Sequence, residues 1–477
     1  MSTLNTKAKQ AETTNLAGGP AFDRTNIKQE LISVVLNKLN NKDCYYMTDK
    51  EIDHKLQQLL AKNNNEFIAK LMVFTRNTIG LRLVPKSLAD YLIKNAKGTD
   101  FLVPALSQSF VRPDDMTDLL ALSSCKKSNA FKRAAKYCLE NKWDAYQLKK
   151  YEQKKLKVKL KDIVKLVHPS LNNYNKKFDN NLDIFKLIIE SKLPNIQTAQ
   201  TMNSAKVEYN KETIGKLGYL ALVKNLVNIF KNNSESGLVD LVDYVCSRIQ
   251  DKNAVQKSKI LPFRFIDAFD KVSHDLELDE FLKQKIKKSL VVALTYSKDT
   301  LNIKGKTAIL LDESGSMNGR PFTYGKALSA SLLSENSLLY TWADYAQLRN
   351  FSSAYDLVSG LDCDGGGTDI NAPLESLIKT NTKVDNIIIL TDMEMYNLGS
   401  SKQSFMQRIA EYKKINPDVK IVFWNLQPYG DAAPVKFGKN ILEVSSCSDY
   451  IVSILGNILE DPNYLIKEIE SVDLTHK

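Results

Sequence analysis

The stretch Asp312-Glu313-Ser314-Gly315-Ser316 decides the fold, because it follows directly on the apolar run Ala308-Ile309-Leu310-Leu311. A short apolar run bounded by turn residues is typical of a buried strand in a parallel sheet. Open α/β sheets bind ligands at the carboxyl ends of their strands, so an aspartate and two alternating serines here indicate a site. By itself the motif is weak, since Asp, Ser and Gly are ordinary loop residues.

Two motifs later in the sequence strengthen this prediction. Gly365-Gly366-Gly367-Thr368-Asp369 supplies a hydroxyl, and Thr391-Asp392 supplies a second carboxylate after the apolar run Ile387-Ile388-Ile389-Leu390. Carboxylate and hydroxyl oxygens suit Mg²⁺ or Mn²⁺ and do not suit Zn²⁺. We therefore expect a divalent ion with one coordination position open to an acidic group of a partner. A set of strand-end turns without an ion is the alternative.

The three-part pattern of Asp-x-Ser-x-Ser, Thr and Asp resembles the metal-ion-dependent adhesion site of the von Willebrand factor A domain. The resemblance implies that the ion is bound by Ser314, Ser316 and Thr368, with Asp312 and Asp392 acting directly or through water. Around the motif, helices are predicted at 323–335, 370–380, 404–414 and 449–459, and strands at 337–343, 386–390, 419–424 and 441–444. This alternation predicts a parallel, doubly wound sheet.

The length of 477 residues exceeds one compact core, so we expect two or more domains. Their predicted bounds are 1–20 for a flexible arm, 21–300 for a helical domain and 301–477 for the α/β domain. No apolar run approaches the roughly 20 residues that span a bilayer, and the N-terminus lacks the apolar part of a secretory signal. Six cysteines without metal-finger spacing predict reduced thiols in a cytoplasmic protein that has no membrane partner.

The N-terminal and C-terminal parts of the chain differ in net charge. Residues 301–477 hold 16 Lys and Arg against 22 Asp and Glu, whereas residues 1–300 hold 50 against 33. A basic first part with a net charge of +17 and an acidic second part with −6 indicate a polyanion as the partner of the first part. A Lys-rich composition that reflects an AT-rich genome is the alternative.

Helical periodicity runs through the first 300 residues with almost no strand signal. Helices are predicted at 30–39, 49–61, 66–77, 85–95, 113–122, 129–140, 182–190, 212–230, 237–249, 262–272 and 279–295. Many short helices joined by short turns predict stacked helix pairs of the HEAT or armadillo type. A compact, irregular helical domain is the alternative, because no clean repeat of about 40 residues is present.

The sharpest charge feature is the segment 142–168, with nine lysines and the interleaved aromatics Trp143, Tyr146 and Tyr151. Lysines bind phosphates and aromatic rings stack on unpaired bases, so this composition indicates RNA binding. A solvated helix face is the alternative. His168, which precedes a proline, fits a helix cap better than a ligand contact.

Five further segments support a resemblance to a known family. In chain order they are Asn15-Leu16-Ala17-Gly18-Gly19-Pro20-Ala21-Phe22, Cys44-Tyr45-Tyr46, Lys150-Tyr151-Glu152-Gln153-Lys154, Leu166-Val167-His168-Pro169 and Leu261-Pro262-Phe263-Arg264. Together with the metal motifs they resemble the TROVE-domain family, which includes the Ro autoantigen and its bacterial orthologues. The resemblance implies a ring of HEAT-like helical repeats closed by the A domain.

The resemblance also implies a function and its residues. Small noncoding Y RNAs are expected on the outer surface of the ring, and single-stranded ends of misfolded or structured RNAs in its central hole. The expected RNA contacts are Lys150, Lys154 and His168, with Lys149 beside them and the basic pair Lys132 and Arg133 nearby. We expect a monomeric ribonucleoprotein scaffold for RNA quality control or processing, with an exoribonuclease as a partner.

Two other functions compete with this one. The α/β domain can be a metal-dependent protein-interaction module, with RNA binding incidental, or Asp312 and Asp392 can be the carboxylates of a metal-dependent nuclease. No nucleophile–base pair stands out, and hydroxyls lie between the carboxylates in the motif. We therefore expect ion coordination for binding and not an enzyme.

Overall fold

The computed structural model describes residues 13–24, 26–38, 44–122, 125–151, 158–170, 184–192, 209–231, 237–296, 303–395, 405–429, 432–446 and 448–475. They belong to two compact units, each built from two stretches of chain. Unit 1 comprises Met1–Leu59 and Leu222–Ile466, and unit 2 comprises Leu60–Ala221 and Lys467–Lys477. Unit 1 includes residues on both sides of the domain boundary expected at residue 300, because the helices after residue 222 pack with the α/β part.

A six-stranded sheet forms the centre of unit 1, in the order β5-β4-β3-β6-β7-β9. Its strands are β3 (Thr307–Asp312), β4 (Ser337–Trp342), β5 (Ala346–Arg349), β6 (Asn386–Thr391), β7 (Lys420–Asn425) and β9 (Ile441–Ser445). Only β5 runs antiparallel to its neighbour. Every residue of β3 and β6 is buried, which is why both strands are apolar runs without alternation.

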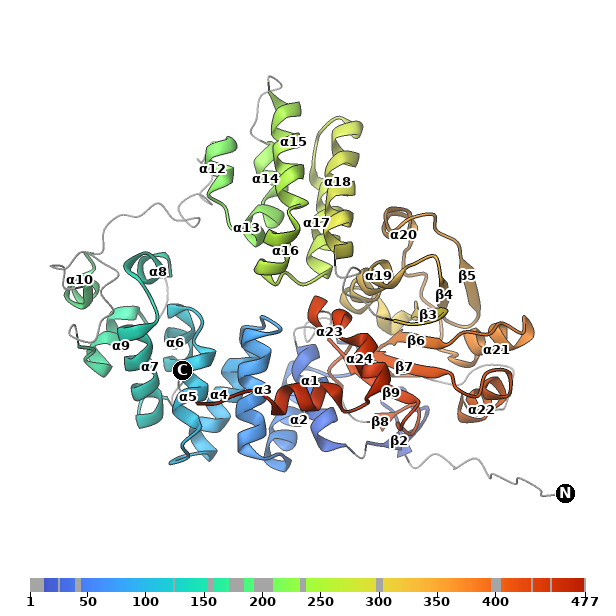
Figure 1. Ribbon diagram of the computed structural model, residues 1–477, viewed down its shortest axis with the longest axis horizontal. Helices are drawn as coiled ribbons and strands as arrows, with labels where there is room; N and C mark the ends of the chain where they lie inside the picture. Colours follow the sequence, from blue (N-terminus) through green and yellow to red (C-terminus); the bar gives the residue numbers. More distant parts are fainter. Residues whose placement is uncertain are drawn as a thin grey trace. The chain divides into compact units, whose positions relative to one another are not determined.

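Helices cover both faces of this sheet (Figure 1). On one face, α21 (Asn371–Lys379) and α22 (Phe405–Ile415) bury Leu374 and Tyr412 against Leu310 and Phe423. On the other face lies α19 (Arg320–Leu332), where a side chain at Gly325 would meet Leu311 at 2.4 Å. The remaining elements here are η4 (Gly315–Met317), α20 (Ala354–Gly360), α23 (Asp449–Ser453) and α24 (Leu455–Glu460).

The N-terminal segment belongs to unit 1 as well. Strands β1 (Thr13–Thr14) and β2 (Pro20–Asp23) pair antiparallel, and β2 pairs with β8 (Ala432–Ala433). Part of the arm expected to be flexible over residues 1–20 is therefore ordered structure, while residues 1–12 lie outside the described residues. Helix α1 (Ile27–Asn37) packs along β9 through the buried polar side chains of Ser33 and Asn37.

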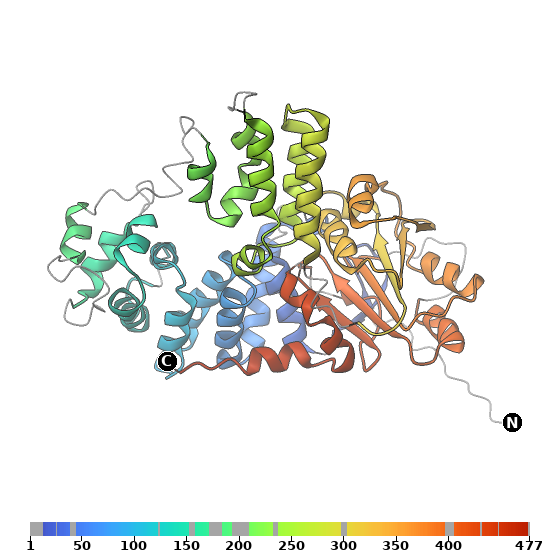
Figure 2. The same cartoon turned by 45° about the horizontal axis from the view of Figure 1, so that its top comes forward.

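A group of helices completes unit 1 (Figure 2). They are α14 (Leu226–Lys231), α15 (Leu238–Ile249), α16 (Lys252–Ser258), α17 (Phe263–Asp275) and α18 (Glu280–Leu294). The single helix expected at 212–230 is wrong, because the chain forms α12 (Lys211–Gly215), α13 (Tyr219–Lys224) and α14 instead. Gly215 and Gly218 lie at the first interruption, where glycine disfavours continued helix.

Unit 2 consists of stacked helices. They are α3 (Asn65–Asn77), α4 (Leu83–Asn95), α5 (Leu102–Ser109), α6 (Pro113–Leu120), α7 (Asn129–Asn141), α8 (Ala145–Lys150), α9 (Leu160–Val167), α10 (Ile184–Glu190) and α12. The odd-numbered helices α3, α5, α7 and α9 contact one another in series, and α4 contacts α6 beside them. Two such layers are typical of stacked helix pairs and support the HEAT-like prediction. The last helices to name, α2 (Asp49–Lys62) and α25 (Tyr464–Glu470), lie at the unit boundaries.

Other sequence expectations can be compared with the described residues. Among these residues, every helix is too short or too polar to span a bilayer. The five cysteines that are described all carry free thiols. The expected combination of a helical-repeat part and a C-terminal, mostly parallel α/β domain is confirmed. Closure into a ring stays a prediction.

Candidate functional site

The ends of two neighbouring strands bring the predicted metal residues together. After β3 the chain moves to β4 on one side of the sheet, and β6 lies on the other side of β3, so the direction of winding changes between β3 and β6. Asp312 ends β3 and Asp392 follows β6, and both side chains are fully buried. Ligands of open α/β sheets bind at such a change of direction.

Hydrogen bonds fix the loop after β3. The backbone N–H of Ser314 donates to Oδ1 of Asp312 at 2.9 Å, and the hydroxyl of Thr391 donates to Oδ2 at 2.7 Å. The hydroxyl oxygens of Ser314 and Ser316 lie 3.4 Å apart. Both oxygens of Asp312 therefore have partners within the protein, and the two serine hydroxyls lie close enough to bind one ligand.

The glycine-rich loop that carries Thr368 lies against this motif. Gly315 donates its N–H to Gly366 O at 3.1 Å, and Gly365 donates to Glu313 O at 3.0 Å. Gly366 has φ +113°, a conformation that residues with a side chain rarely adopt. Thr368, two residues after Gly366, is 8% exposed, so the loop carries a nearly buried threonine.

The electrostatics of the two buried aspartates favour a cation. Burial raises the pKa of Asp392 well above its usual value, and the carboxylates of Asp312 and Glu394 raise it further. Burial likewise raises the pKa of Asp312, to about 6. Oδ2 of Asp392 is buried and has no hydrogen-bond partner. A buried carboxylate oxygen without a donor is costly unless a proton or a cation neutralises it.

These residues fit a hard divalent ion. Two carboxylates and three hydroxyls provide only oxygen donors, as Mg²⁺ and Mn²⁺ prefer. The described part of the chain contains no cluster of three or more His, Cys, Asp or Glu side chains suited to a metal. The candidate site therefore depends on the hydroxyls of Ser314, Ser316 and Thr368 as much as on the two aspartates.

Sequence reasoning missed the residues that cover this site. Tyr46 lies beside Ser316, and burial followed by the charges of Asp392 and Glu394 raises the pKa of Tyr46 to about 12. The segment before it is held in place because Tyr45 donates its N–H to the hydroxyl of Tyr429 at 3.0 Å. Residues 44–46 lie 270 or more positions before Ser316 in the chain. No pattern in the neighbouring sequence predicts that they contact the candidate metal site.

The N-terminal segment forms hydrogen bonds with Glu394 and Met395, two and three residues after Asp392. The backbone N–H of Leu16 donates to Oε2 of Glu394 at 2.7 Å, and the amide of Asn15 donates to Met395 O at 2.8 Å. A Cβ on Gly19 would lie 2.0 Å from Met395 O, so only glycine permits this approach. Residues expected to belong to a flexible arm thus pack against the loop that follows Asp392.

The predicted RNA contacts lie on helices of unit 2. Lys132 and Arg133 belong to α7, and Lys149 and Lys150 end α8. His168 is the C-cap of α9, with φ 46° and its N–H bonded to Val164 O, as a cap requires. The remaining prediction, Lys154, lies outside the described residues.

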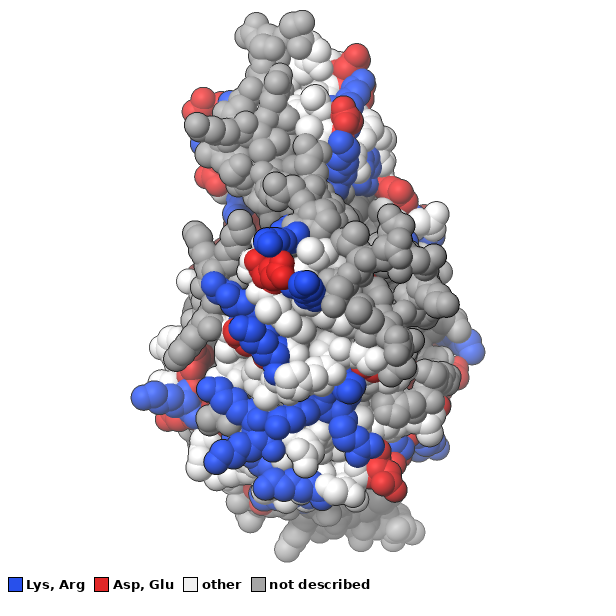
Figure 3. All heavy atoms as spheres, turned by 90° about the vertical axis from the view of Figure 1, so that its left-hand side faces the viewer, with Lys and Arg blue, Asp and Glu red and all other residues white. Residues whose placement is uncertain are grey.

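Acidic side chains on these helices are used internally. Asp144 caps α8 by accepting from Gln147 N at 2.6 Å, and Asp162 accepts from Lys159 N at 2.8 Å. Six basic residues are at least partly exposed and form no ion pair with another described residue: Lys132, Arg133, Lys136, Lys159, Lys161 and Lys165. Figure 3 shows the face of the molecule at this end of unit 2, with a band of Lys and Arg side chains and few acidic ones.

The aromatics of this segment differ from the prediction. Trp143 is 4% exposed and donates its indole N–H to Val111 O, so it is part of the core and is not a stacking surface. Tyr151 remains partly exposed, with the guanidinium of Arg112 4.6 Å and the ammonium of Lys150 5.6 Å from its ring centroid. The side chain of Tyr146 lies outside the described residues.

The fold and the site define a class: stacked helices combined with a doubly wound α/β domain that has acidic and hydroxyl side chains at its strand ends. The crystal structure of the Deinococcus radiodurans Ro (RSR) protein has a similar fold, with a TM-score of 0.58 and 13% identity over 91% of this chain and 100% of that one. Residues 197–309 match the model of the TROVE domain. This match supports the resemblance to the TROVE-domain family.

Proposed function

We propose that this protein binds RNA through the basic surface, which we define as the partly exposed cations of α7, α8 and α9. The observation that supports it most is the imbalance of charge. Five of these cations, and Lys159 at the N-cap of α9, lack an ion pair with any described residue, while Asp144 and Asp162 are used as helix caps. Unpaired cations on a rigid helical surface bind phosphates without recognising a sequence.

The family resemblance narrows the kind of RNA. We propose small, structured, noncoding RNA of the Y type as the main ligand, and single-stranded ends of misfolded RNA as a second one. The protein then acts in the cytoplasm as a monomeric scaffold that presents RNA to an exoribonuclease and does not cleave it. Incubation of RNA with the purified protein and Mn²⁺ is expected to leave the RNA intact.

A salt series with a labelled, structured RNA tests this function. Affinity is expected to decrease steeply as salt rises, with a slope of about −0.7 to −0.9 per neutralised phosphate on logarithmic axes. RNA recovered with the protein from cells and then sequenced identifies the ligand. An affinity that is weak and independent of salt contradicts the proposal.

A second function is favoured by the orphaned carboxylate oxygen of Asp392. We propose that Ser314, Ser316 and Thr368 hold Mg²⁺ or Mn²⁺ together with Asp312 and Asp392. Such an ion supplies an open coordination position for an acidic group of a protein partner. Calorimetric titration with Mn²⁺ tests the site, since one ion per chain is expected and a protein that takes up no ion contradicts it.

A further inference from the structure

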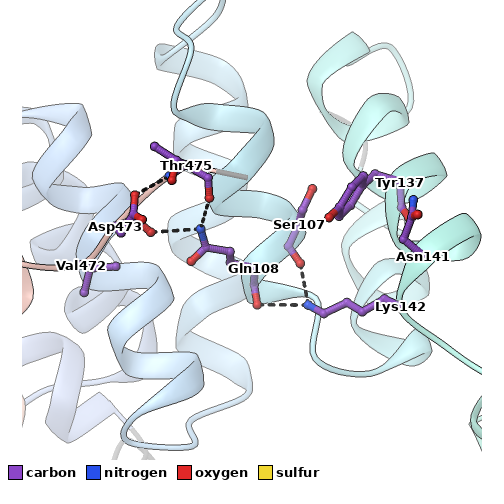
Figure 4. Close-up of a pocket in the computed structure, with 8 residues that line it drawn as sticks. All are labelled: Ser107, Gln108, Tyr137, Asn141, Lys142, Val472, Asp473 and Thr475. Carbon is purple, nitrogen blue, oxygen red and sulfur yellow. Dashed lines mark hydrogen bonds between the residues drawn. The ribbon is translucent and has the colours of Figure 1, made fainter. Parts of the chain in front are cut away.

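A cavity of about 490 Å³ in unit 2 takes no part in the functions above (Figure 4). It lies between α5, α7 and the C-terminal residues 472–475. This volume is within the range of about 300–1,000 Å³ that is typical of small-ligand clefts. All its lining residues belong to unit 2, so unit 2 alone forms it.

Hydrogen bonds hold two sides of the cavity rigid. The ammonium of Lys142 donates to Ser107 O and to Phe110 O, both at 2.7 Å, and thereby satisfies carbonyls at the end of α5. The amide of Gln108 donates to Asp473 O and Thr475 O, both at 3.0 Å, and fixes the C-terminal segment beside α5. A site held by such bonds needs little reorganisation to receive a ligand.

The third side is a stripe of α7. Arg133, Tyr137 and Asn141 follow one another at intervals of four residues, so they lie on one face of the helix. Arg133 and Asn141 are exposed and Tyr137 is half-buried. Figure 4 shows Tyr137 and Asn141 on α7, across the cavity from Gln108 and the C-terminal segment. The stripe leads from a guanidinium of the basic surface to an aromatic ring and an amide at the cavity.

We propose that this cavity receives one unpaired base of a bound RNA strand, stacked on the ring of Tyr137. An aromatic ring offers a stacking surface to any base. The Nδ2 of Asn141 donates to Tyr137 O at 2.9 Å, so the side-chain oxygen of Asn141 and the hydroxyl of Thr475 offer hydrogen bonds to the edge of the base. The phosphate next to this base then lies near Arg133. The inference rests on the proposed RNA binding. It specifies which part of the RNA, an unpaired base, is bound by unit 2.

Photocrosslinking tests the position of the base without altering the protein. A structured RNA with a single-stranded 3′ tail that contains 4-thiouridine is irradiated with the full-length protein, and crosslinked peptides are identified by mass spectrometry. Crosslinks within residues 137–142 or 472–475 are expected. Crosslinks confined to other segments overturn the proposal.

Variants of Tyr137 test the stacking. Tyr137→Ala is expected to weaken binding of the tailed RNA by about tenfold, whereas Tyr137→Phe keeps the ring and the affinity. Tyr91→Ala, which removes another half-buried tyrosine of unit 2 that does not line the cavity, is the matched control for stability. Equal affinity of Tyr137→Ala and wild type, with salt-sensitive RNA binding intact, overturns the cavity proposal alone. Failure of the wild type to bind RNA overturns the proposed function and this inference together.

Discussion

The hydroxyl of Thr391 donates a 2.7 Å hydrogen bond to Oδ2 of Asp312, which joins the ends of the adjacent strands β6 and β3. Because Ser314 N occupies Oδ1, the carboxylate of Asp312 is satisfied without an ion. Asp392, the next residue after Thr391, keeps one buried oxygen without any partner. The two aspartates are therefore not equivalent, and a bound cation matters most to Asp392.

This difference predicts opposite effects of one substitution with and without metal. In chelator, Asp392→Asn is expected to stabilise the protein by about 1 kcal/mol, since it neutralises one of two neighbouring buried carboxylates. In Mn²⁺ at a hundred times its Kd, the wild type gains about 2.7 kcal/mol and the variant gains little. Thermal unfolding under both conditions measures this, with Asp362→Asn, an exposed carboxylate, as the control. Equal stabilisation of wild type and Asp392→Asn by Mn²⁺ contradicts the metal assignment.

The basic surface predicts a charge-specific loss of RNA binding. The double variant Lys132→Glu/Arg133→Glu is expected to bind structured RNA at least tenfold more weakly and to show a smaller salt slope, because it removes phosphate contacts. Lys62→Glu/Lys97→Glu changes the net charge equally at exposed positions of unit 2 away from α7, α8 and α9. Filter binding across a salt series compares them. An equal loss in both variants indicates a net-charge effect and contradicts a local surface.

A buried ion pair predicts a large loss of stability in unit 2. Arg76 of α3 and Asp115 of α6 pair at 2.7 Å with both side chains at most 7% exposed. Asp115→Ala is expected to cost about 3–5 kcal/mol, because it leaves the guanidinium buried without its partner. Asp90→Ala, which breaks the surface pair with Lys94, is expected to cost less than about 1 kcal/mol. Urea unfolding measures both free energies, and similar values for the two variants contradict the prediction.

The contact between the N-terminal segment and the loop after β6 predicts that the stability of the protein depends on a glycine at position 19. Gly19→Ala places a methyl group against Met395 O, so it is expected to cost about 1–3 kcal/mol and to expose residues 13–23 to proteases. At Gly218 no atom lies within 4 Å of an added methyl group, and Gly218→Ala is the control. Limited proteolysis with mass spectrometry reports the first cleavage site. Unchanged protection of the N-terminus in Gly19→Ala rejects the expected clash.

Much of the fold follows from patterns that are local in the sequence. The buried runs before Asp312 and Asp392 predict adjacent central strands, because residues buried on both faces must all be apolar. The predicted helix over 212–230 failed because its apolar stripe continues through Gly215 and Gly218, where the backbone does not stay helical. Trp143 failed as a stacking surface because composition does not show which face of a segment packs inward.

The sequence alone determined the type of sheet and the charge of α7 to α9, and it identified the oxygen-bearing side chains that we propose as metal ligands. Each of these depends on residues that lie close together in the chain or at the ends of parallel strands. Only the tertiary structure brought Tyr46 and the Asn15–Gly19 segment to the metal residues, and the C-terminal segment to Gln108. These contacts join residues more than 250 positions apart, and hydrogen bonds to backbone atoms form most of them. Backbone groups are the same in every residue, so such contacts leave no pattern in the sequence.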